Sequence, residues 1–93
     1  MRQALHAYVE GYVQGVGFRV YVRQRAQFLG LKGWVRNTSA GEVEVHAEGE
    51  REDLEVLLRS LEKGPSGSSV KNVRAQWTSP GDEFDEFDIE RSW

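Results

Sequence analysis

The sequence contains no cysteine, only two prolines and a single methionine among its 93 residues. The lack of cysteine excludes disulfide bonds, thiolate zinc sites and cysteine nucleophiles, so the hydrophobic core alone must hold the fold. No apolar run approaches the length of a membrane-spanning helix. Residues 1–6 also lack the apolar segment and cleavage site of a secretory signal peptide. We therefore expect a cytoplasmic protein without a membrane segment.

Positive charge is also scarce, because 12 Lys and Arg residues face 15 Asp and Glu residues for a net charge of −3. Non-specific nucleic-acid binding depends on clustered Lys and Arg, so we expect no nucleic-acid partner. Much of the acidity lies in residues 82–88, whereas Arg19, Arg23 and Arg25 flank a glycine-rich loop. Attraction for a small anion would therefore be local. The length predicts one domain over residues 1–93 and excludes a second lobe.

Apolar and polar residues alternate in several segments, which is typical of half-buried strands. This pattern predicts strands over residues 4–13, 34–38, 42–48 and 70–78, and a short edge strand over residues 87–90. In the third of these segments Val43, Val45 and Ala47 are expected to face the core. Its other residues, including Glu44 and Glu48, are expected to form a solvated face.

Two segments have helical spacing instead. After the glycine loop, one stripe is expected to comprise Val20, Val22, Ala26 and Leu29, with Phe28 beside it and Gly30 as C-cap. The second helix follows Gly49, which is expected to break the preceding strand. Its apolar stripe is expected to comprise Leu54, Leu57, Leu58 and Leu61, with Gly64 as C-cap.

The resulting order, β-α-β-β-α-β with an extra C-terminal strand, predicts an α+β protein with the ferredoxin-like split βαβ arrangement. We expect an antiparallel sheet with two helices on one face. The third strand would lie between the first two, which places their C-terminal ends on one sheet edge, about 10 Å apart. Strand parity then predicts that Asn37, like Val35, points toward the helices, near the start of the first one.

The stretch that most directly suggests a function is the loop after the first strand, residues 11–19, GYVQGVGFR. Glycines permit left-handed backbone conformations, and a helix N-terminus offers N–H groups and partial positive charge to a phosphate. The spacing is not that of a Walker loop, and the third glycine of a dinucleotide fingerprint is missing. The loop by itself predicts only an anion-binding site.

Two longer motifs make the prediction more specific. Residues 13–19 (VQGVGFR) and 29–37 (LGLKGWVRN), followed by 41–45 (GEVEV), Gly49 and residues 64–65, resemble the acylphosphatase family in the same order. The resemblance covers nearly the whole chain. It implies a ferredoxin-like enzyme that hydrolyses the carboxyl-phosphate anhydride of an acylphosphate to a carboxylate and inorganic phosphate, without a metal or other cofactor.

The resemblance also implies roles for individual residues. Arg19 matches the arginine that binds phosphate, and Asn37 matches the asparagine that positions the attacking water. The phosphate-binding residues it implies are Gln14, Gly15, Val16, Gly17, Phe18 and Arg19. In the family's usual mechanism a phosphate oxygen of the substrate accepts the proton, so no general base is expected. His6 and His46 are expected to be cross-strand or solvent-facing residues rather than metal ligands.

An alternative is a ferredoxin-like binding or regulatory module for RNA or a small anionic ligand, without catalysis. Such an RNA-binding sheet needs exposed aromatic and basic residues, and the third strand offers mainly glutamates. A domain of a larger carbamoyl-transfer assembly is a further alternative; we expect a free-standing monomer instead. The sequence leaves open which acylphosphate is the substrate and whether the C-terminal carboxylate of Trp93 contacts Arg19.

Overall fold

The computed structural model describes residues 1–90 and has the predicted order of elements. The elements are β1 (Arg2–Tyr12), α1 (Phe18–Phe28), β2 (Lys32–Asn37), β3 (Val43–Glu50), α2 (Arg51–Lys63), β4 (Ser69–Thr78) and β5 (Phe87–Ile89). The strand bounds differ from the sequence prediction by two residues at most, and the end of β4 and the start of β5 agree with it. The small differences arise because hydrophobic patterns mark strand ends weakly.

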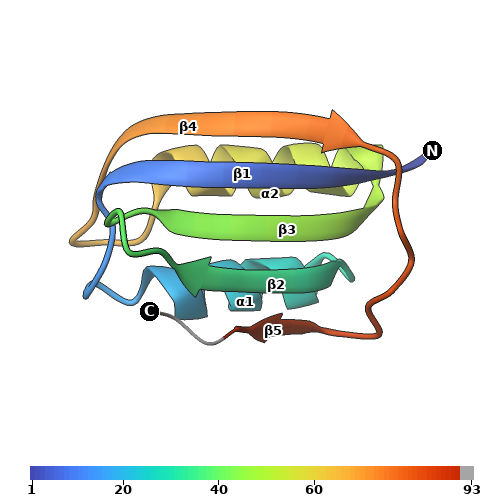
Figure 1. Ribbon diagram of the computed structural model, residues 1–93, viewed down its shortest axis with the longest axis horizontal. Helices are drawn as coiled ribbons and strands as arrows, with labels where there is room; N and C mark the ends of the chain where they lie inside the picture. The colour runs from blue at the N-terminus through green and yellow to red at the C-terminus, as the bar shows by residue number, and fades with distance from the viewer. Residues whose placement is uncertain (91–93) are drawn as a thin grey trace.

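The five strands form one sheet in the order β4-β1-β3-β2-β5. Neighbouring strands among the first four are antiparallel, so β3 lies between β1 and β2 as predicted. The short strand β5 adds to the free edge of β2 in parallel orientation, which makes the sheet mixed. Both helices lie behind the sheet on one face (Figure 1). The ferredoxin-like α+β architecture is therefore confirmed.

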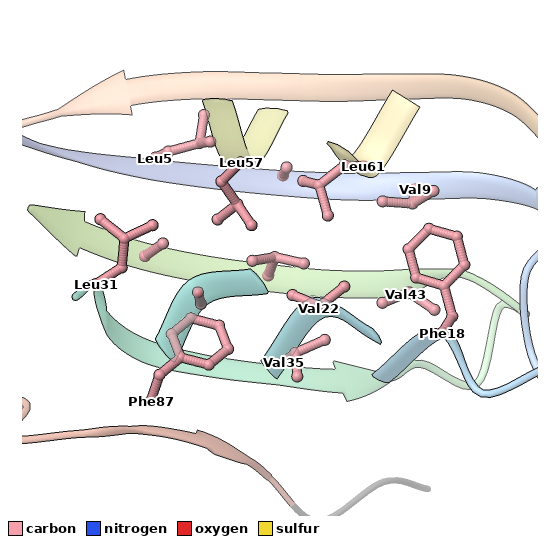
Figure 2. Close-up of a cluster of buried hydrophobic side chains, with 14 of the residues drawn as sticks. Leu5, Val9, Phe18, Val22, Leu31, Val35, Val43, Leu57, Leu61 and Phe87 are labelled. Atoms are coloured by element: carbon pink, nitrogen blue, oxygen red, sulfur yellow. The ribbon is translucent and has the colours of Figure 1, made fainter. Parts of the chain in front are cut away.

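The core fills the space between the sheet and the two helices (Figure 2). The inward residues of β1 and β3 are completely buried, namely Leu5, Ala7, Val9, Val43, Val45 and Ala47. Leu54, Leu57 and Leu61 of α2 pack against them, and Leu58 is partly buried, as the predicted stripe requires. Each buried leucine contributes about 1.5–3 kcal/mol through removal of apolar surface from water.

The buried face of α1 differs from the prediction. Phe18, Val22 and Ala26 are buried, whereas Val20 is 42% exposed and Phe28 is 81% exposed. Successive residues of a helix are separated by about 100°, so Val20 lies on roughly the opposite side from a stripe through residues 18, 22 and 26. The prediction of Val20 as a core residue was wrong because the stripe begins at Phe18.

The end of α1 has the predicted glycine cap. Gly30 has a φ of 72°, and its N–H donates to the carbonyl of Gln27. The N–H of Leu31 donates to the carbonyl of Ala26, which completes a Schellman motif. This tight reversal directs the chain from α1 into β2, where the second part of the site lies.

Gly49 does not break β3, which runs to Glu50 and pairs Gly49 with Gln3. A Cβ atom at Gly49 would lie 2.5 Å from Cδ2 of Leu31. The glycine therefore makes room for a core side chain, and packing rather than strand termination explains it.

The helix-free face of the sheet is less solvated than expected. Glu44 is 5% exposed and Glu48 only 3% exposed, which contradicts the predicted solvated glutamate face. His6 and Arg36 contact Glu44 from the neighbouring strands, while the segment between β4 and β5 approaches Glu48. The alternating pattern gave the correct face, but it could not indicate what would cover that face.

Candidate active site

The loop between β1 and α1 adopts a left-handed conformation at two glycines. Gly15 and Gly17 have φ angles of 76° and 77°. A Cβ at either position would meet no atom within 4 Å, so backbone conformation rather than crowding requires glycine there. Gly17 is also the N-cap residue of α1, and its carbonyl accepts the N–H of Tyr21. The loop thus leads directly into the positive end of a helix.

A cavity of about 170 Å³ opens at this point. Its lining comes from the loop, the first turn of α1, the end of β2 and β5, and comprises Val13, Gly15, Gly17, Phe18, Arg19, Val20, Asn37 and Ile89. Five of the predicted site residues therefore share one cavity, although they come from two separate stretches of sequence. Of the other two, Val16 packs against the core, and the side chain of Gln14 is directed to the β2–β3 turn.

Arg19 is the second residue of α1 and is partly exposed. The first turn of α1 contains no acidic residue. The guanidinium is always charged and offers five N–H donors in a planar fork that matches two oxygens of a phosphate. A guanidinium and a helix N-terminus are both groups that favour a nearby anion.

Asn37 is the last residue of β2 and pairs with Val43 of β3. Val35, two residues earlier, is completely buried, and the Oδ1 atom of Asn37 is buried as well. The side chain of Asn37 therefore points to the helical side of the sheet, into the cavity beside the start of α1, as strand parity predicted. An amide there offers both a hydrogen-bond donor and an acceptor.

Ile89 is a lining residue that sequence reasoning missed. Strand β5 pairs Ile89 with Val35, and the N–H of Glu90 donates to the carbonyl of Val35 over 2.8 Å. This pairing closes one side of the cavity with an apolar wall. The sequence of a short strand after an acidic run does not indicate which strand it will pair with, so the pairing of β5 with β2 was not predictable. The sequence left open whether the C-terminal carboxylate of Trp93 contacts Arg19, and Trp93 lies outside the described residues.

Other chemically active side chains lie elsewhere. His6 and His46 form a cross-strand pair on the helix-free face, as expected. Within residues 1–90, no group of three or more His, Asp and Glu side chains is arranged to hold a metal ion. Over the same range, none of the helices combines the length and apolar character needed to cross a membrane.

Comparison with known proteins agrees with this geometry. The acylphosphatase family model matches residues 5–89. An acylphosphatase of Pseudomonas paraeruginosa is 53% identical over 75 residues, which cover 81% of this chain and 82% of that protein. The crystal structure of acylphosphatase from Bacillus subtilis superposes with a TM-score of 0.92 and 32% identity, and the match covers 98% of this chain and 100% of that one.

A third match is part of a larger protein. Full-length HypF, solved in a phosphate- and nucleotide-bound form, matches with a TM-score of 0.90 and 35% identity. The match covers 99% of this chain but 12% of HypF.

The fold and the cavity define a ferredoxin-like α+β protein with a glycine-rich loop and a cavity at the start of its first helix. The family model and the close relatives make the assignment more specific. The chain belongs to the acylphosphatase family and is an enzyme of that family.

Proposed function

We propose that this protein hydrolyses acylphosphates by attack of water on the phosphorus, without a metal ion, using Arg19 and Asn37. The observation that carries the proposal is the convergence of the glycine loop, Arg19 and Asn37 on one cavity at the N-terminus of α1. The products are a carboxylate and inorganic phosphate. The carboxylate is a good leaving group, which lowers the demand for acid catalysis.

Phosphate binding is assigned to the loop and Arg19. Phosphoryl transfer spreads negative charge over the equatorial oxygens, so preorganised donors contribute most of the catalysis. Backbone N–H groups between Gln14 and Phe18 surround the oxygens, and Arg19 adds a bidentate, charge-assisted contact. The two left-handed glycines support this role, because alternating backbone handedness turns successive N–H groups toward one anion.

Asn37 is assigned the role of orienting the attacking water. Its amide holds the water in line with the bond that breaks, but it is too weak a base to remove a proton. Oxygen of the water bonds to phosphorus, the bond from phosphorus to the carboxyl oxygen breaks, and a phosphate oxygen of the substrate accepts the proton. Orientation is the contribution of the protein, and a positioned nucleophile can account for several kcal/mol of the barrier.

Several wider features belong to the same proposal. Residues 1–93 act as one domain, as a monomer in the cytoplasm, with an acylphosphate and water as its partners. The net charge of −3 supports the absence of a nucleic-acid partner. The match to 12% of HypF indicates that this fold also occurs as one part of a larger protein. The relatives of similar length support the proposal that this domain acts on its own.

The direct test is an ultraviolet assay with benzoyl phosphate in the presence of a metal chelator. We expect turnover that the chelator does not reduce, and a loss of kcat/KM of about 10³ or more in Arg19→Ala. Arg23→Ala is the matched control, because Arg23 also lies in α1 but does not line the cavity. Equal activity of the wild-type protein and Arg19→Ala would overturn the proposal.

A further inference from the structure

The side chain of Gln14 connects the glycine loop to the turn that follows Asn37. Its Nε2 atom lies 2.9 Å from the carbonyl oxygen of Thr38 and 2.8 Å from that of Glu42. Both acceptors are carbonyls, so only the NH₂ end of the amide can face them. The two hydrogen bonds span 24 and 28 residues of sequence. They join the β1–α1 loop to the β2–β3 turn.

These carbonyls already close the base of that turn. The N–H of Thr38 donates to the carbonyl of Glu42, and the N–H of Gly41 donates to the carbonyl of Thr38. The hydroxyl of Thr38 also accepts the N–H of Glu42. A carbonyl oxygen can accept two hydrogen bonds, so Gln14 takes the second position on each. Thr38, whose carbonyl is held in this way, directly follows Asn37, and the N–H of the Asn37–Thr38 peptide donates to the same Glu42 carbonyl that Gln14 binds.

We propose that Gln14 is a positioning residue that sets the distance between the phosphate loop and the water-orienting amide of Asn37. The inference rests on the proposed function, and it assigns the Gln14 side chain to the turn rather than to the phosphate. The loop fixes the phosphorus atom and Asn37 fixes the water, so their separation determines the attack geometry. A displacement of about 1 Å in such a site costs about 10² in rate.

The test compares replacements of similar length. Gln14→Met keeps the length and removes both donors, whereas Gln14→Lys restores an N–H donor within reach of the carbonyls. We expect Gln14→Met to lower kcat by about 10² while the inhibition constant of inorganic phosphate changes by no more than about twofold. Gln14→Lys should recover part of the lost kcat.

Gln27→Met is the matched control. Gln27 also donates one side-chain hydrogen bond to a distant carbonyl, that of Phe87 over 3.0 Å, and it does not line the cavity. We expect its kcat to stay within about twofold of the wild-type value. Thermal unfolding of each variant shows which losses of activity arise from loss of fold.

A double-mutant cycle shows whether Gln14 affects kcat through Asn37. In an Asn37→Ala background, Gln14→Met should change kcat by less than about twofold, because the residue it positions is gone. An undiminished effect in that background, or a loss of phosphate affinity that matches the loss of kcat, would overturn the proposal and place Gln14 in direct contact with phosphate.

A spectroscopic measurement separates this inference from the proposed function. The side-chain NH₂ signals of Asn37 should shift in Gln14→Met and return toward their wild-type positions in Gln14→Lys, whether or not benzoyl phosphate is hydrolysed. Absence of turnover in the wild-type protein would therefore refute the proposed function alone. Unmoved Asn37 signals in a folded Gln14→Met variant would refute the positioning role alone.

Discussion

His6 Nδ1 lies 3.1 Å from His46 Nδ1 across the pair of strands β1 and β3. The Nε2 atom of His6 contacts Glu44 at 2.7 Å, and that of His46 contacts Glu48 at 2.9 Å. A hydrogen bond between the two Nδ1 atoms needs a proton on one of them. The four side chains therefore form a continuous polar row on the helix-free face of the sheet.

The two carboxylates in this row are buried but favoured in their charged form. Burial alone would raise the pKa of Glu44, but hydrogen bonds from His6, Arg36 and Tyr8 outweigh it and hold the pKa below its ordinary value. Burial likewise opposes ionisation of Glu48. Hydrogen bonds from His46 and from the backbone N–H groups at residues 81 and 82 lower the pKa of Glu48 below its ordinary value.

Acid should therefore destabilise the fold through Glu44 and Glu48. Both carboxyls have a lower pKa in the folded state than the ordinary value of 4.5. Their contribution to the free energy of unfolding is thus fully present above about pH 4.5 and is lost as the pH falls through the folded pKa. Urea unfolding between about pH 3 and pH 7 measures this slope.

The variant Glu48→Gln should flatten that acid slope and lower the free energy of unfolding at neutral pH by about 2 kcal/mol, because charge-assisted hydrogen bonds are lost. Glu62→Gln, on the exposed side of α2, is the control and should leave the slope unchanged. The interpretation fails if both variants keep the wild-type slope.

The left-handed glycines allow stability and function to be separated. Gly15 and Gly67 have φ angles of 76° and 89°, and a Cβ at either would meet no atom within 4 Å. Each should therefore lose about 1 kcal/mol of stability on replacement by alanine, from backbone strain alone. Only Gly15→Ala should also weaken inhibition by inorganic phosphate, because Gly67 lies outside the cavity. Equal phosphate affinity in the two variants would show that the glycine loop is not part of the phosphate-binding site.

Much of this arrangement was predictable because local patterns determine it. Alternation identified the inward residues of β1 and β3, and the topology of a split βαβ unit placed Asn37 beside the start of α1. Gly30 and Gly64 marked the ends of the helices for a backbone reason that does not depend on the rest of the fold.

The parts that could not be predicted depend on contacts between distant segments. Burial of Glu44 requires side chains from β1 and β2, and the cavity wall at Ile89 requires the parallel addition of β5. The contact of Gln14 with the β2–β3 turn joins residues 24 and 28 positions apart. No local period in the sequence indicates which of many polar side chains will meet across such distances.

Arg19→Lys should retain phosphate binding in part and lose most of the catalysis. Lysine keeps the positive charge, but its ammonium is a point charge that cannot make the planar, bidentate contact of a guanidinium. We expect kcat/KM for benzoyl phosphate to fall by about 10²–10³, the cost typical of one lost transition-state donor. Retention of wild-type kcat would show that only the charge of Arg19 matters.

Asn37→Ala should separate binding from chemistry most sharply. Asn37 lines the same cavity as the loop and Arg19 but comes from β2, so its removal leaves the proposed phosphate contacts in place. We expect kcat to fall by about 10²–10³ because the water loses its orientation. Inorganic phosphate should still raise the thermal unfolding temperature of the variant, as it does for any protein whose folded state alone binds the ligand.

The conservative change Asn37→Asp also tests the role of the Asn37 amide in orienting the water. It keeps the size of the side chain but replaces an amide donor with a negative charge facing the phosphate, so we expect both kcat and phosphate protection to fall. Asn72→Ala is the control, because Asn72 is exposed on β4 and does not line the cavity. If Asn37→Ala instead lost phosphate protection and kcat together, Asn37 would be part of the phosphate site and would not act on water alone.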